Sequence, residues 1–201
     1  GDAADQELLN KTRINRASYL IGVVGDDGVN AEIAVNAETL SQSRKEGTLT
    51  CIIHVFDDQL WRLLRQKELH TNSTSRFRLE LFNIFDRGAH LMVQDNPPWV
   101  DLDPGCAPQI LVVGLGKMGQ RVIVEAARGW QVNREDPSLK ISFTLVDIEA
   151  EKKLSLLLNQ HPRLEKLATF TTLDMDILSG EFDRLGERFL QDGSCQLELC
   201  Y

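Results

Sequence analysis

Three glycines stand at a spacing that can hold a phosphate group. Gly114, Gly116 and Gly119 form the pattern G-x-G-x-x-G directly after an apolar run. The first glycine permits a tight turn, the second lets the backbone approach a pyrophosphate, and the third lets a helix pack closely on the sheet. The N-terminus of that helix presents unpaired N–H groups to an anion. We therefore expect a nucleotide-binding loop formed by Gly114, Gly116, Lys117, Met118 and Gly119.

An acidic residue at the end of the next predicted strand completes this pattern. Asp147 follows the apolar run 141–146, further from the loop than the usual spacing of about 20 residues because residues 132–139 supply an extra loop. A carboxylate there can accept hydrogen bonds from both ribose hydroxyls of an adenosine, and it repels a 2′-phosphate. NAD or NADH is thus expected rather than NADP, with ATP, ADP or AMP as alternatives.

Two basic side chains, Lys117 and Arg121, flank the glycine loop. Either could touch a phosphate, but a P-loop lysine requires the ending G-K-[ST], which this loop lacks. We therefore expect both side chains on solvated surface.

Two aspartate pairs are the other candidates for chemistry. Asp26-Asp27 and Asp57-Asp58 each follow a predicted strand and precede a predicted helix, where a carboxylate caps N–H groups and complements the helix dipole. Capping is the expected role. Asp26 and Asp27 also lie at the carboxyl end of a strand, so a share in a binding cleft stays open. No catalytic motif or metal-ligand spacing is present, and we expect neither catalytic residues nor a metal.

Composition favours a cytoplasmic protein that does not bind nucleic acid. The 30 acidic residues outnumber the 22 basic ones, which gives a formal net charge of −8, whereas binding to a phosphate backbone needs the opposite balance. No apolar run reaches the length of about 18 residues that a membrane helix needs. The four cysteines form no C-x-x-C pair, and reduced thiols of a cytoplasm are the simplest interpretation.

Alternating strand and helix patterns predict an α/β fold with a parallel, Rossmann-like sheet and flanking helices. The segment 97–108 is rich in proline and glycine, so we expect a linker there between a lobe at 1–96 and a lobe at 109–201. Strand-like runs occupy residues 19–24, 49–56, 77–81, 109–113, 141–146, 168–173 and 196–201. The first of these is expected to be buried.

An apolar helical stripe precedes the expected linker, formed by Phe82, Phe85, Ala89 and Met92. A single small lobe covers such a stripe poorly, so we expect the lobes to pack as a pseudo-repeat, or two chains to pair as a dimer or higher oligomer. The chain also starts without methionine and ends inside an apolar run, from which we expect a fragment of a larger protein.

The segment ILVVGLGKMGQ, residues 110–120, resembles the opening of a TrkA-N domain, also called RCK, a family that regulates potassium conductance in bacterial transporters and channels. The segments GDAAD at 1–5, INRA at 14–17 and GDDGVN at 25–30 resemble the late part of such a domain. The chain therefore begins with segments that resemble the late part of one such domain and continues with the opening of a second. In this alignment LDMD at 173–176 corresponds to GDAA at 1–4, and Leu173 stands where the first segment has a glycine.

The resemblance implies two tandem TrkA-N-like units at the inner face of a membrane, with nucleotide binding coupled to the gating of a channel or transporter whose membrane segment lies outside this chain. It carries nucleotide contacts over to Gly114, Gly116, Gly119 and Asp147. Two alternatives stay open. One is a fragment of an NAD-dependent oxidoreductase, which would need a proton-transfer residue that is not evident after Asp147. The other is a structural interaction lobe with a vacant pocket.

Overall fold

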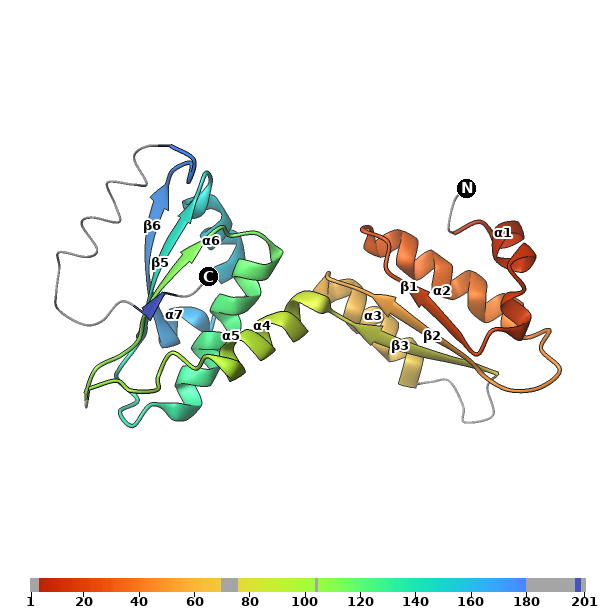
Figure 1. The fold of residues 1–201 in the computed structure, drawn as a ribbon, viewed down its shortest axis with the longest axis horizontal. Coiled ribbons are helices and arrows are strands. Elements are labelled where there is room, and N and C mark those ends of the chain that lie inside the picture. The colour runs from red at the N-terminus through yellow and green to blue at the C-terminus, as the bar shows by residue number, and fades with distance from the viewer. Residues whose placement is uncertain (1–3, 70–75, 104, 180–197, 200–201) are drawn as a thin grey trace. The chain divides into compact units, whose positions relative to one another are not determined.

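Two separate parallel sheets organise the chain (Figure 1). The computed structural model describes residues 4–69, 76–103, 105–179 and 198–199. The chain divides into a first unit, Gly1–Ile84, and a second unit, Phe85–Tyr201, each with its own sheet and flanking helices. This mixed α/β architecture is compatible with the Rossmann-like fold expected from the sequence.

The first unit is built from strand–helix–strand crossovers. Its strands are parallel in the order β1-β2-β3, and parallel neighbours need a long connection, usually a helix. Its elements are α1 (Gln6–Lys11), the short 3-10 helix η1 (Ile14–Arg16), β1 (Tyr19–Gly22), α2 (Asp27–Ser41), β2 (Leu49–His54), α3 (Asp58–Leu69) and β3 (Phe77–Phe82). Phe82, expected on the next helix, therefore ends a strand.

The core of the first unit lies on one face of its sheet. Leu49, Cys51 and Ile53 are alternate residues of β2 with no exposed surface, and they pack with Ala34 and Ala37 of α2. Burial raises the pKa of the Cys51 thiol to about 12, so this thiol stays protonated at neutral pH. Cys51 is thus a packing residue.

Strand β1 differs from the expectation of a buried strand. It ends at Gly22, and its alternate residues Tyr19 and Ile21 are 66% and 61% exposed. Within the described residues β1 pairs with β2 alone and is an edge strand. An apolar run indicates a strand but does not reveal whether a neighbour covers it, and for this reason the expectation was wrong.

The second unit contains a parallel sheet in which the chain adds strands first on one side of β4 and then on the other. The parallel order is β6-β5-β4-β7, so the chain runs from β4 to β5 and β6 and then returns to the other side of β4. This equals the order 3-2-1-4 that opens a doubly wound dinucleotide-binding sheet. The elements are α4 (Ile84–Asp95), β4 (Gln109–Val113), α5 (Lys117–Asn133), β5 (Ile141–Asp147), α6 (Ala150–Gln160), α7 (Leu164–Leu167), β6 (Ala168–Asp174) and β7 (Glu198–Leu199).

The core of the second unit joins this sheet to α5 and α6. Ile110, Phe143 and Phe170 are register partners on adjacent strands, and the two phenylalanine rings stack with centroids 5.6 Å apart. Ile123 of α5 and Leu157 of α6 pack into the same buried cluster. Figure 1 shows α5 and α6 beside the strands β4, β5 and β6.

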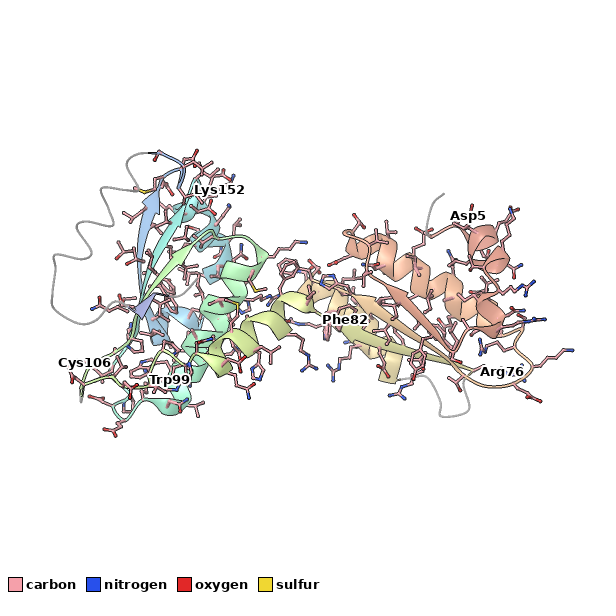
Figure 2. All side chains as sticks on the ribbon, viewed as in Figure 1. Asp5, Arg76, Phe82, Trp99, Cys106 and Lys152 are labelled. Carbon is pink, nitrogen blue, oxygen red and sulfur yellow. The ribbon has the colours of Figure 1, made fainter. Side chains whose placement is uncertain are left out.

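The chain divides after Ile84, upstream of the segment 97–108 that we expected as the linker. Helix α4 belongs by its packing to the second unit, because Ala89 and Val93 are buried there and Val93 joins the core. Trp99 of the expected linker also lies against this core (Figure 2). The proline and glycine content of 97–108 therefore marks a loop inside the second unit.

Candidate functional site

The junction between β4 and α5 turns at Gly114. This residue has φ +94°, in the left-handed region that glycine adopts without a steric penalty. Its N–H donates to the carbonyl oxygen of Val146 at 2.8 Å, which ties the turn to β5. The first glycine of the motif is therefore required by the backbone.

Gly119, in the first turn of α5, lets this helix lie directly on the turn. A Cβ at Gly119 would overlap the carbonyl oxygen of Gly114, which belongs to the backbone and cannot rotate away. The third glycine is thus required by close packing, as the motif predicts.

Gly116, the residue that caps α5, meets no such requirement. Its φ of −71° suits any residue, and a Cβ there would find no atom within 4 Å. Gly116 provides no side-chain hydrogen bond to the first turn of α5. The cap position of α5 would therefore accept a side chain without a steric clash.

Asp147, the last residue of β5, fixes the glycine loop. Its Oδ2 accepts a hydrogen bond from the N–H of Leu115 at 2.8 Å. Its Oδ1 accepts from the N–H of Glu149 at 3.1 Å and from the ammonium of Lys153 at 2.6 Å. Leu115 is fully buried, and its carbonyl accepts from the side chain of Gln120 at 3.0 Å. The loop is thus held from both sides.

These contacts set the charge of the Asp147 carboxyl group. Burial acts to raise its pKa, since only 8% of the residue is exposed. The hydrogen bonds from Lys153 and from the N–H groups of Glu149 and Leu115 act in the opposite direction and prevail, so the pKa lies below its ordinary value of 3.8. The site therefore holds a carboxylate with an ammonium partner at neutral pH.

Two side chains of the glycine loop, Lys117 and Met118, turn toward α4. The ammonium of Lys117 lies 5.7 Å from the centroid of the Phe85 ring, and the end of Met118 lies against Gly88. Contacts of these two residues with a ligand would therefore come from their backbone N–H groups.

Arg121 differs from the expected solvated side chain. Its Nε lies 3.1 Å from Oδ1 of Asp86 on α4, and only 12% of the side chain is exposed. The expectation failed because nothing in the sequence indicated that α4 packs on this face of α5.

The corresponding junction in the first unit, between β1 and α2, is closed by its own side chains. Asp26 accepts a hydrogen bond from the N–H of Val29 at 2.9 Å, so its expected capping role is confirmed. Asp27 accepts instead from the N–H groups of Phe56 and Asp57, at 2.8 and 2.7 Å, and thereby joins α2 to the loop after β2. Both carboxylates thus have structural partners.

Asn30 is a structural residue of this junction that the sequence did not reveal. It is fully buried, and its Oδ1 accepts from the N–H of Val24 at 3.0 Å. Its Nδ2 donates to the carbonyl oxygens of Val24 at 2.7 Å and His54 at 3.1 Å. The available signal was an amide one turn before Ile33 on the apolar face of α2.

The segment 173–176, matched in the family resemblance to residues 1–4, ends β6 beside the start of α6. Oδ1 of Asp174 accepts a hydrogen bond from the N–H of Glu151 at 3.1 Å. Residues 1–3, the other half of the comparison, lie outside the described residues.

Comparison with known proteins gives no match: no family model, no curated protein and no solved structure is similar to this chain. In the parts of the chain that the structure describes, no helix is both long and apolar enough to cross a membrane. Nor do three or more histidine, cysteine or acidic side chains gather there as metal ligands would. What the site can do therefore rests on its geometry.

Proposed function

We propose that this chain is a nucleotide-binding regulatory module. In this proposal the β4–α5 junction binds an adenine nucleotide, NAD or NADH in the first place and ATP, ADP or AMP as alternatives. The two units belong to tandem TrkA-N-like domains at the cytoplasmic face of a membrane. Nucleotide binding biases the gating of a potassium or other cation channel or transporter, whose membrane segment lies outside this chain.

Gly116 carries the nucleotide part of the proposal. The fold itself would be served better by serine, aspartate or asparagine, because these residues cap a helix more strongly than glycine does. The backbone conformation and the surrounding space both admit a side chain. A glycine at this position suits a ligand phosphate that approaches the backbone and accepts from the N–H groups of α5.

The strand order gives independent support. Open α/β sheets bind ligands outside the carboxyl ends of their strands, at the point where the strand order reverses. In the second unit the chain reverses around β4, and the glycine loop lies at the carboxyl end of that strand. A phosphate at the loop and a ribose beside Asp147 would occupy this point.

The regulatory part rests on the resemblance of residues 110–120 to the TrkA-N opening and on one feature of the packing. Helix α4 contacts α5 through Lys117 and Met118 of the glycine loop and through Arg121, which follows the loop. The same helix continues directly from β3 of the first unit. A ligand that favours one arrangement of α4 on α5 would bias a two-state equilibrium of the whole chain.

The test is a calorimetric titration of the full chain with NAD, NADH, ATP, ADP and AMP. We expect at least one of them to bind and Gly116→Val to weaken every phosphate-bearing nucleotide, because the valine side chain occupies the phosphate position. Gly25→Val is the matched control. Gly25 follows β1 in the first unit, also has no atom within 4 Å of a Cβ, and should leave binding unchanged.

Circular dichroism checks that both variants stay folded. Absence of binding to the native chain contradicts the proposal, and so does equal binding by native chain and Gly116→Val.

A further inference from the structure

The acceptor capacity of Asp147 is nearly used up. An ionised carboxylate offers about four lone-pair sites. Its Oδ1 already accepts from Glu149 and Lys153, and its Oδ2 accepts from Leu115. One site, on Oδ2, is left for a ribose hydroxyl. The two hydrogen bonds that a ribose could donate to a bare carboxylate are therefore not both available while Lys153 stays in place.

The ammonium of Lys153 is the more accessible half of this ion pair. Its side chain is 30% exposed, whereas that of Asp147 is 8% exposed. A ribose hydroxyl that donates to Asp147 would have its oxygen about 2.7 Å from the carboxylate. The ribose hydroxyl and the Lys153 ammonium would then be bound to the same carboxylate and lie next to each other. The neighbouring Lys152, which Figure 2 labels, lies 2.6 Å from a carboxylate oxygen of Glu149, and its side chain is 68% exposed.

We propose that Lys153 is the residue that sets specificity at the ribose, and that it allows this site to bind a 2′-phosphorylated nucleotide such as NADP. A bare carboxylate repels a 2′-phosphate, which carries a charge of about −1.5 to −2. Here the ammonium neutralises the carboxylate and supplies a donor to phosphate oxygens. The proposal rests on the proposed nucleotide site and revises its preference for NAD over NADP.

The experiment compares NAD and NADP in calorimetric titrations of the full chain and three variants. For the native chain we expect the two dissociation constants to agree within about tenfold. Lys153→Met should weaken NADP by roughly ten- to a hundredfold, the worth of a charge-assisted hydrogen bond. It should leave NAD bound at least as tightly, because an acceptor site on Asp147 becomes free for a ribose hydroxyl. Lys153→Arg keeps the charge and should retain NADP. Lys152→Met is the matched control and should change neither ligand.

The outcomes separate this inference from the function on which it rests. If Lys153→Met weakens NAD and NADP equally, Lys153 only positions Asp147 and the inference is overturned while the nucleotide site stands. If the native chain binds NAD but excludes NADP, the inference is likewise overturned. If neither ligand binds the native chain, the nucleotide site fails and the inference fails with it. Thermal unfolding of each variant guards against loss of the fold.

Discussion

The two strand–helix junctions of this chain share a topology but differ in what completes them. At the β1–α2 junction, Asp26 caps the helix and Asp27 accepts from the next loop. At the β4–α5 junction, Gly116 adds no side chain and leaves the first turn of α5 without a side-chain cap. The first junction is thus capped by a side chain of its own, and the second is capped by a residue that has no side chain.

The difference teaches that a βα turn is not by itself a binding site. Both turns lie at the carboxyl end of a parallel strand, where a helix dipole favours an anion. In the first unit the protein supplies that anion as Asp26. In the second unit the cap residue is Gly116, and Asp147 accepts hydrogen bonds from the N–H of Leu115 and the ammonium of Lys153. No atom lies within 4 Å of the position that a Cβ at Gly116 would take.

The largest loss of stability is expected from a substitution at the β1–α2 junction. Asn30→Leu removes three hydrogen bonds that join the buried amide of Asn30 to the backbone of Val24 and His54. We expect the first unit to lose about 1.5 to 4.5 kcal/mol of unfolding free energy, since each of the three lost hydrogen bonds is worth about 0.5 to 1.5 kcal/mol. Hydrogen exchange resolved by unit measures this loss.

Nucleotide binding in the second unit should survive the same substitution under conditions where the first unit stays folded. Loss of nucleotide binding while the second unit stays folded would contradict the claim that only the β4–α5 junction binds the nucleotide.

A smaller effect is expected from the pH dependence of the open junction. The pKa of folded Asp147 lies below 3.8, so its contribution to stability is fully present above 3.8 and is lost as the pH falls toward the folded pKa. The stability difference between the native chain and Asp147→Asn should stay constant from pH 7 down to about pH 5 and shrink below 3.8. Denaturant unfolding across this range measures it.

The control for this series is Asp26→Asn, because asparagine caps a helix about as well as aspartate. A stability difference at Asp147 that does not depend on pH would mean that the carboxylate charge does not hold the loop.

The sequence predicts the parts of this site that lie close together along the chain. The apolar run before Gly114 and the glycine spacing predicted the strand, the turn and the helix, because each depends on local backbone geometry. The exposed edge of β1 and the position of α4 were not predictable in this way. They depend on which elements become neighbours, and hydrophobic periodicity alone does not determine that.

The same limit applies to individual side chains. Asp147 was found because a strand end has a fixed place in the pattern. The hydrogen bonds of Asp147 to Leu115 and Lys153 depend on distances across the fold, so its role in fixing the loop was not anticipated. Asn30 was overlooked because a single amide on an apolar helix face has no distinctive spacing.

The substitution Gly116→Asp tests the central claim most directly, because it converts the open junction into a copy of the closed one. The new carboxylate would cap α5 as Asp26 caps α2, so the second unit should be unchanged or more stable by a few tenths of a kcal/mol. The same carboxylate would occupy and repel the phosphate position. Unfolding by denaturant and calorimetric titration with NAD are therefore measured on one preparation. The account predicts retained stability with loss of NAD binding, and undiminished NAD binding by this variant would contradict it.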